Sequence, residues 1–342
     1  MTRTKMKKNR SLFEYEERME ELTKKKSHLE RLNQIIDWEL FRPSLERAFY
    51  KEAKAPGGAS HYDYVFMFKV LIIQKFYGLS DEQTEYQIKD RLSFQKFLGL
   101  TLSDDVPDEK TIWHFRERLI KSGVIEELFH LFNAYLEKEG IIGNEGLIID
   151  ATFVEAPRQR NNRDENKKIK QGEVPEGWEE NEYKMRQKDM DARWTKKNNE
   201  SYYGYKNHVK ADKDSKIILS YHTTSANVHD SQALGNLLTD NDRGKHAWAD
   251  SAYANQPILE EYDLKLHIHE KSYRHRKLTD EQKQLNREKS RVRARVEHIF
   301  GFVVTTMKGF NVRSRGILRA HGNVGLTNLI YNMCRYWQFV NA

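Results

Sequence analysis

The sequence predicts an α/β catalytic domain preceded by an all-helical N-terminal domain. Up to about residue 140 the hydrophobic residues recur with helical spacing, and helix start and stop signals punctuate the chain. From Gly146 on, short apolar runs typical of strands alternate with helical stretches, an order that indicates a mixed α/β domain. The 342 residues suffice for about two domains, and 38% hydrophobic residues suffice for their cores.

The composition limits the classes of protein to which the chain can belong. The one cysteine, Cys334, excludes an intramolecular disulfide and a zinc site built from several thiolates. The longest apolar run, residues 64–73, is interrupted by Lys69 and is far shorter than the ~18 residues of a membrane helix. No apolar segment follows the basic N-terminus, so we expect neither secretion nor membrane contact. The net charge of +7 and the pI of about 9.1 indicate a polyanionic partner, usually nucleic acid.

Residues 1–36 are expected to form a basic arm followed by a helix. The first ten residues contain five Lys or Arg and no acid, which suits either contact with phosphates or a solvated tail. Apolar side chains then follow heptad-like steps to residue 36, but Lys26 and Asn33 fall on the same seam. These polar seam positions favour packing into the core over a coiled-coil dimer.

Residues 37–140 are expected to form a helical DNA-binding domain. Residues 56–58, Pro-Gly-Gly, mark a loop. Residues 64–77 are apolar nearly all round, which predicts a buried helix. Ser80 with Gln83 is a capping-box signal for the helix that follows.

A later helix of this domain carries candidate DNA contacts. A start signal at residues 105–108 precedes a helix with Ile112, Phe115 and Leu119 on one face. Basic and aromatic side chains occupy the rest of its surface, and short helices joined by tight turns resemble a helix-turn-helix DNA reader. The alternative is a helical domain that serves packing alone. The candidate contacts with DNA are Lys110, Trp113, His114 and Arg116.

Residues 144–342 are expected to form the α/β catalytic domain. An apolar strand over residues 147–149 ends in Asp150, and a second over residues 246–249 ends in Asp250. The other expected elements are a charged insertion or long loop at about 156–200, strands over 203–209, 216–223 and 264–269, a helix over 231–238, and long helices from about 280 and from about 322.

Three carboxylates in this domain are candidates for metal-assisted phosphodiester cleavage. Sites in open α/β sheets form at the C-terminal ends of strands, which favours Asp150 and Asp250. Glu297 lies in a helical stretch rich in arginine. Mg²⁺ prefers oxygen ligands, and two such ions can activate the attacking oxygen and stabilise the leaving one. A single Asp at a strand end is more often a cap or a turn former, so the case depends on three acids in a basic setting.

Ordered motifs run through nearly the whole chain, from about residue 38 to residue 337. They are Lys69–Gln74, Leu79–Glu85, Asp90–Phe94, Thr111–Arg116, Ile149–Thr152, Gly204–His208, His229–Ser231, Ala249–Tyr253 and Arg293–Glu297. Together they resemble the DDE transposases of the bacterial insertion sequence five family, within the wider insertion sequence four group. The resemblance implies a ribonuclease-H-like catalytic domain in which Asp150, Asp250 and Glu297 bind the metal ions.

The residues around Glu297 match the family's pattern in part. In the wider group a Tyr and an Arg precede the catalytic Glu and a Lys follows it. Arg293 fills the Arg position, and on a helix its guanidinium is expected to hold the Glu297 carboxylate or to grip a phosphate. The Tyr position falls on Ser290 and the Lys position on Val304, with Lys308 as a substitute one turn later. The other candidate DNA contacts are Lys206, His208, Arg291, Arg295 and Lys308.

Two further sets of side chains are weaker candidates. His267, His269 and His275 invite a metal interpretation, but basic residues are interleaved and no cysteine is near, which favours surface or phosphate-facing histidines. Asp230 precedes a helix and is first a capping residue, and Asp250 is preferred as the second acid because an apolar strand leads into it. The sequence has no glycine-rich phosphate loop, so nucleotide hydrolysis is not indicated.

The sequence therefore predicts a DNA transposase that binds the terminal inverted repeats of its element, cleaves phosphodiesters and transfers strands to target DNA. The expected cofactor is Mg²⁺ (two ions, with Mn²⁺ as a substitute). The expected partner is double-stranded DNA, bound by a homodimer in the bacterial cytoplasm, at the nucleoid. The alternatives are a non-catalytic, transposase-derived DNA-binding protein and a metal nuclease of the same fold that cuts without joining.

Overall fold

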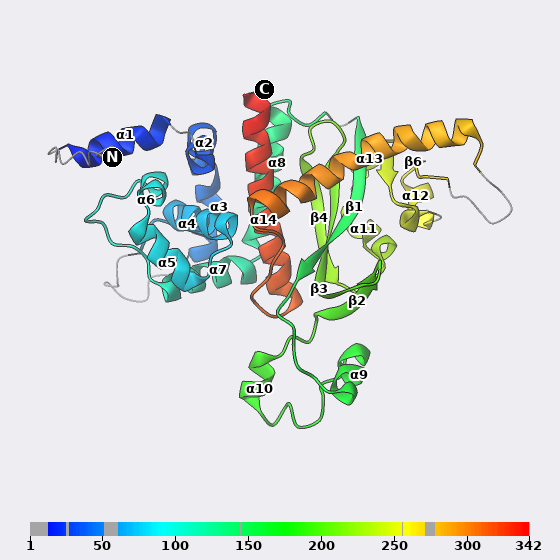
Figure 1. Cartoon of the computed structure of the whole chain (residues 1–342), viewed down its shortest axis with the longest axis horizontal. Helices are drawn as coiled ribbons and strands as arrows, with labels where there is room; N and C mark the ends of the chain where they lie inside the picture. Colours follow the sequence, from blue (N-terminus) through cyan, green and yellow to red (C-terminus); the bar gives the residue numbers. More distant parts are fainter. Residues whose placement is uncertain are drawn as a thin grey trace, which may run out of the picture.

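The computed structural model of the chain describes residues 13–24, 27–50, 61–143, 145–254, 256–270 and 278–341. The expected basic arm at residues 1–10 and the loop at residues 56–58 lie outside this described part. The helices that precede residue 140 occupy one side of the molecule and the sheet the other, with helix α14 (Ile317–Val340) between them (Figure 1). In the part of the chain that is described, no helix is both long and apolar enough to cross a membrane.

The N-terminal part is helical, as the sequence predicts. Its elements are α1 (Glu14–Lys24), α2 (His28–Ile35), η1 (Trp38–Phe41), α3 (Arg42–Phe49), α4 (Tyr64–Tyr77), α5 (Asp81–Asp90), α6 (Leu92–Leu98), α7 (Glu109–Lys121) and α8 (Val124–Lys138). The predicted buried helix is confirmed as α4, and Gly78, which caps its C-terminal end, has a left-handed conformation. The capping box of Ser80 and Gln83 is confirmed at the start of α5.

The N-terminal segment does not form one helix up to residue 36. Helix α1 ends at Lys24, and a second helix, α2, begins at His28. Ser27 caps α2, because its side chain accepts a hydrogen bond from the backbone N–H of Glu30. Leu29 and Leu32 of α2 are fully buried in the core, in agreement with the interpretation that this segment packs into the core. Helix α1 has no buried residue.

The C-terminal part is built on a mixed sheet, which confirms the predicted α/β order. Its strands are β1 (Gly146–Glu155), β2 (Arg193–Lys197), β3 (Glu200–Asp212), β4 (Ile218–Ser225), β5 (His246–Ala249) and β6 (Lys265–His267). The strand order is β2–β3–β1–β5–β6, with β4 also paired to β3. β5 pairs in parallel with β1 and β6, whereas β3 pairs antiparallel with β1, β2 and β4.

The segment at 156–200 is not the long loop that its composition suggests. It contains α9 (Arg163–Gln171), α10 (Glu182–Gln187) and strand β2, and the two helices lie apart from the sheet (Figure 1). Trp178 is fully buried there, and its indole N–H donates to Glu165 at 2.9 Å. A capping box of Asn162 and Glu165 starts α9, so a local helix signal was present in the sequence.

The remaining helices cover the two faces of the sheet. They are η2 (Asp230–Ala233), α11 (Leu234–Leu237), η3 (Asp240–Asp242), η4 (Ser251–Tyr253), α12 (Pro257–Glu261) and α13 (Asp280–Thr306). Alternate residues of β1 belong to different apolar clusters. Ile148 and Val154 pack with α14 and the N-terminal helices, whereas Leu147 and Ile149 pack with α11.

Helix α14 joins the two parts of the molecule. It is buried along most of its length and packs against α8, α4 and β4. The approach is close enough to require glycine, since a Cβ on Gly325 would lie 2.1 Å from the Oη of Tyr221. One apolar cluster therefore runs from α2 through α14 to the sheet. Packing is continuous across residue 140, where the sequence predicts a domain boundary.

Candidate active site

Parallel pairing of β1 with β5 brings two of the predicted acids side by side. The last paired residues are Ile149 and Ala249, so Asp150 and Asp250 are the next residues on neighbouring strands. β5 ends there, as predicted, but β1 does not. It continues to Glu155, because the long strand β3 pairs with it over this stretch.

The two acids have opposite pKa shifts. Burial raises the pKa of Asp150, and the negative charge of Asp250 adds to the rise, while Arg293 and Lys197 oppose it. Burial also disfavours ionisation of Asp250, but the backbone N–H of Ser251 and the positive charge of Arg293 outweigh it and lower the pKa of Asp250. The pair thus places negative charge in a partly buried setting, which a cation would stabilise.

Arg293 of α13 supplies positive charge to this pair. Its Nη2 lies 3.6 Å from the Oδ2 of Asp150. Its Nε is buried and, within the described residues, has no hydrogen-bond partner. The sequence predicts that this guanidinium holds Glu297 or a phosphate, but in the structure it faces Asp150.

Glu297 stands apart from the acid pair. It follows Arg293 by one turn of α13 and is exposed, next to the buried Val296 that packs α13 onto the core. No three His, Cys, Asp or Glu side chains of the described ranges form a group able to hold a metal ion. The expected group of three acids is therefore not assembled in this conformation, and Asp150 and Asp250 meet without Glu297.

The acid pair alone fits a magnesium ion in the type of its donors. Mg²⁺ usually takes one or two carboxylates and completes its shell with water and substrate phosphate. Besides Arg293, the Asp150 carboxylate accepts a hydrogen bond from the backbone N–H of Ala151 at 2.8 Å. These contacts leave oxygen lone pairs for a cation.

Two residues near the acid pair were not singled out in the sequence. Tyr253 in η4 is 1% exposed, and its Oη has no hydrogen-bond partner in the described part of the chain. Burial and the negative charges of Asp230, Asp150 and Asp250 raise the pKa of Tyr253, so its hydroxyl stays protonated and able to donate. Lys197 of β2 adds positive charge to both acids of the pair. Tyr253 closes a recognised motif, whereas no local signal marks Lys197 within the charged insertion.

Lys206 and His208 of β3 have different surroundings. The Nζ of Lys206 lies 2.7 Å from the Oδ1 of Asp230, which makes Asp230 an ion-pair partner. His208 is fully buried, and its Nε2 lies 2.8 Å from the Oγ1 of Thr224. Burial lowers the pKa of His208 to about 4, so the ring is neutral at pH 7. His208 is therefore a core residue and, contrary to the prediction, is not exposed for contact with DNA in this structure, because the elements packed over β3 bury it.

The candidate DNA contacts on α7 are exposed with one exception. Lys110, Trp113 and His114 lie on the surface, and Trp113 is 41% exposed. Arg116 is half-buried, and its Nη2 lies 2.9 Å from the Oδ2 of Asp81. Arg116 therefore ties α7 to the start of α5.

The cations around Glu297 also divide by their contacts. Arg291 is exposed, whereas Arg295 lies 2.7 Å from the carboxylate of Asp214 in an ion pair. Lys308 follows the end of α13, is exposed, and has a φ of 62°. Arg291 and Lys308 are therefore the more accessible of these candidate DNA contacts.

The histidines of the β6 region do not share a site. The Nε2 of His267 lies 2.7 Å from the Nδ1 of His246, whereas the Nε2 of His269 lies 2.9 Å from the Oγ of Ser290. His275 lies outside the described residues. The two described histidines therefore have different partners, and the interpretation of all three as surface or phosphate-facing residues stays a prediction.

Comparisons with known proteins give matches along most of the chain. A family model described as "Transposase DDE domain" matches residues 142–333, more than half of the chain. A second model, described as "Transposase domain (DUF772)", matches residues 17–118. The chain is also similar to a solved structure described as "Cryo-EM structure of piggyBac transposase synaptic complex with hairpin DNA", at 12% sequence identity and a TM-score of 0.43, with 90% of this chain and 72% of that chain covered.

Proposed function

The chain belongs to the family of transposases with a DDE domain, and from this premise we propose that it is a DNA transposase of the bacterial insertion sequence five family. Its substrates are the terminal inverted repeats of its own element and a target duplex. Residues 37–140 serve as the DNA-binding domain and residues 144–342 as a ribonuclease-H-like catalytic domain. The observation that carries this proposal is the register of β1 and β5, which sets Asp150 beside Asp250.

Asp150, Asp250 and Glu297 are the proposed ligands of two Mg²⁺ ions, for which Mn²⁺ can substitute. Bound Mg²⁺ would polarise the scissile phosphate and lower the pKa of the attacking water. Arg293 neutralises Asp150 in the DNA-free protein and contacts a phosphate near the scissile bond when DNA binds. Lys197 keeps positive charge beside the site, where the DNA backbone would approach.

The reaction proceeds in two displacements at phosphorus. Water first attacks the phosphodiester at each end of the element, which releases a 3′-hydroxyl. That hydroxyl then attacks a phosphodiester of the target and displaces the 3′-oxygen of the target strand, which leaves as a free 3′-hydroxyl, so the element becomes joined and no covalent bond to the protein forms. Two ends must be held together for this reaction, and we therefore propose a homodimer on DNA.

Cleavage of a repeat-end duplex by purified protein tests the assignment of the second acid. Asp250→Asn should abolish Mg²⁺-dependent cleavage while repeat binding stays within about threefold, because metal ligation and DNA docking use different groups. Asp230→Asn is the matched control, since it removes the same charge from the partner of Lys206 and should retain most of the activity. Loss in the Asp230 variant with near-normal cleavage by the Asp250 variant would reverse the assignment.

A strand-transfer assay separates a transposase from a nuclease of the same fold. Duplexes that already end in the 3′-hydroxyl of the element are offered together with a target plasmid. We expect joined products from the wild-type protein and none from Asp150→Asn. Efficient cleavage without joining would favour the nuclease, and repeat binding with neither reaction would favour the non-catalytic DNA-binding protein.

A further inference from the structure

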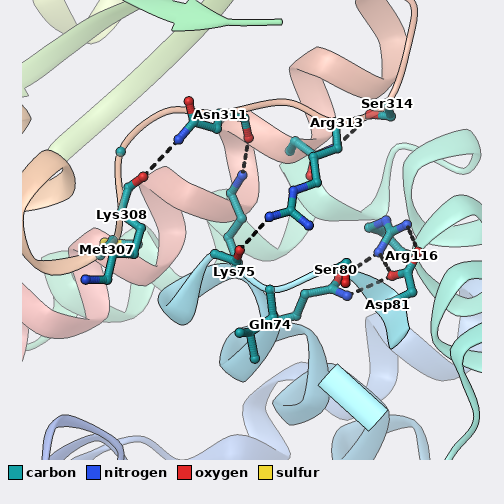
Figure 2. Close-up of a pocket in the computed structure, with 14 residues that line it drawn as sticks. Gln74, Lys75, Ser80, Asp81, Arg116, Met307, Lys308, Asn311, Arg313 and Ser314 are labelled. Atoms are coloured by element: carbon teal, nitrogen blue, oxygen red, sulfur yellow. Dashed lines mark hydrogen bonds and ion pairs between the residues drawn. The ribbon is translucent and has the colours of Figure 1, made fainter. Parts of the chain in front are cut away.

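A cavity of about 200 Å³ lies where the N-terminal helices meet the connection between α13 and α14 (Figure 2). The turn from α4 to α5, residues 74–81, forms one wall, and residues 307–314 form the opposite wall. Arg116 of α7 and Asn323 of α14 complete the lining. The cavity thus exists only where the two parts of the molecule are docked together.

Positive charge predominates in the lining of this cavity. Its cations are Lys75, Arg116, Lys308 and Arg313, and Asp81 is the acid among the lining residues. Arg116 neutralises Asp81, because its two terminal nitrogens bind the two oxygens of that carboxylate. The positive charge of Arg313 also favours the ionised form of Asp81, but one acid offsets only one of the four cations, so the lining keeps a net positive charge.

The contacts of Lys75 and Arg313 are to neutral groups. The Nζ of Lys75 donates to the carbonyl oxygen of Asn311 at 3.3 Å, and the Nη2 of Arg313 donates to that of Gly78 at 3.0 Å (Figure 2). Over the described ranges, neither side chain has an ion pair with an acid within 4.0 Å. Each retains further N–H donors for a ligand.

Repulsion among these cationic side chains raises the electrostatic free energy of the cluster when no anion is bound. Burial, together with the positive charges of Arg116 and Arg313, lowers the pKa of Lys75 to about 8. A bound anion would offset both the burial of the ammonium and the repulsion among the cations. The cavity is therefore adapted to an anionic group.

The cavity is connected to the strand that carries Asp150. The backbone N–H of Glu155, the last residue of β1, donates to Phe310 at 3.0 Å, and Val312 donates back to Glu155 at 2.9 Å. Glu155 lies five positions after Asp150 on the same strand, which corresponds to about 17 Å. That span equals about five base pairs along a DNA helix axis.

We propose that Lys75, Lys308 and Arg313 form a binding site for a backbone phosphate of the element's end DNA, about five base pairs from the scissile bond. This inference rests on the proposed function and deepens it. Since the two walls come from the N-terminal helices and from the connection after α13, a phosphate seated between them would tie repeat binding to the placement of α13. The helix that carries Arg293 and Glu297 would thereby respond to a correctly bound end.

The first test measures binding of a repeat-end duplex by the full-length protein at several salt concentrations. Lys75→Gln and Arg313→Gln should each weaken binding about tenfold and should reduce the slope of log K against log salt by about 0.9, the value for one lost phosphate contact. Lys138→Gln at the exposed end of α8 removes the same charge and should change binding less than twofold. These substitutions leave no acid unpaired, because both cations bind carbonyls.

The second test locates the phosphate with duplexes that carry a single uncharged methylphosphonate. Moved along the strand from three to seven base pairs from the cleavage point, the modification should weaken wild-type binding about tenfold at one position. At that position Arg313→Gln should bind modified and unmodified duplexes equally, whereas Lys138→Gln should discriminate like the wild type. The absence of any position with this pattern overturns the assignment to DNA.

A third measurement separates failure of the site from failure of the proposed function. Inorganic phosphate should raise the Tm of the wild-type protein and of Lys138→Gln, and the rise should be lost in Arg313→Gln. Phosphate stabilisation without a sensitive DNA position would identify a site for free phosphate and would overturn our proposal. Wild-type cleavage of repeat ends with no difference among the variants would overturn the site and leave the proposed function standing.

Discussion

Two carboxylates and one guanidinium meet where β1 passes the end of β5. The Nη2 of Arg293 lies 3.6 Å from Asp150, and its charge favours the ionised form of both acids. A divalent cation at the pair would use the same electrostatic attraction. In the DNA-free protein the guanidinium and the cation therefore compete, whereas during catalysis a guanidinium beside the scissile phosphate would help.

Arg293→Gln should have opposite effects on metal binding and on cleavage. Calorimetry on the DNA-free variant should show Mg²⁺ binding strengthened on the order of tenfold, about 1.4 kcal/mol, because a positive charge beside the carboxylates is removed. Single-turnover cleavage at saturating protein should be slower than wild type by at least tenfold, because a contact with the scissile phosphate is lost.

Arg291→Gln is the matched control for this prediction, since Arg291 lies two residues away and is exposed. It should leave Mg²⁺ affinity unchanged and mainly weaken DNA binding, with a flatter salt dependence. Arg295→Gln should resemble it with a smaller effect, because Asp214 already pairs with Arg295. Equal cleavage rates for all three variants under saturation would remove Arg293 from the active site.

Local signals in the sequence predict the secondary-structure elements whose positions are determined by interactions between residues close in the chain. The apolar surface of residues 64–77 and the capping box of Ser80 predict α4 and the start of α5 within a residue. The sequence analysis does not predict the interruption before α2 or the start of α9, although Ser27 and Asn162 are caps of the usual kind. A heptad-like pattern masks the first cap, and a highly charged composition masks the second.

The candidate site divides in the same way. Asp150 and Asp250 could be predicted because an apolar strand leads into each, and parallel pairing then sets them together. The continuation of β1 could not, because it depends on pairing with β3 about 55 residues later. The placement of Arg293 and Glu297 depends on how α13 lies across the sheet, and the burial of His208 depends on the elements packed over β3. No local pattern encodes these tertiary relations.

Two helical glycines with different surroundings test how closely α14 packs against the sheet. A Cβ on Gly325 would lie 2.1 Å from the Oη of the buried Tyr221, whereas nothing lies within 4 Å of a Cβ on Gly301 in α13. Gly325→Ala should destabilise the protein by about 1–3 kcal/mol through overpacking. Gly301→Ala should stabilise it by about 0.5–1 kcal/mol through helix propensity. Denaturant unfolding measures both, and equal effects of the two substitutions would contradict the close packing of α14.

At the scale of the whole molecule, α14 makes the N-terminal helices and the sheet one body. It runs parallel to α8, since Asn332 donates to Asn133 at 2.9 Å and the hydroxyls of Tyr135 and Tyr336 lie 3.1 Å apart. The same Asn133 donates to the carbonyl oxygen of Ile218 in β4 at 2.9 Å. The change in hydrophobic periodicity predicts a domain boundary near residue 140. Periodicity does not show, however, that α14, the last helix, fills the core of the N-terminal helices.

A fragment that ends at residue 140 should therefore fail to fold on its own. Without α14 the apolar face of α8, including Phe132, whose ring packs against Tyr336, would be exposed to water. We expect no cooperative thermal transition and strong binding of a hydrophobic dye.

A fusion of residues 1–140 to residues 312–342 should restore a cooperative transition, provided that the linker can return along the length of α8, about 22 Å. About 15 Gly and Ser residues suffice for that distance. If the isolated fragment instead unfolds cooperatively at a Tm close to that of the fusion, the N-terminal helices form an independent domain and α14 is not needed to complete it.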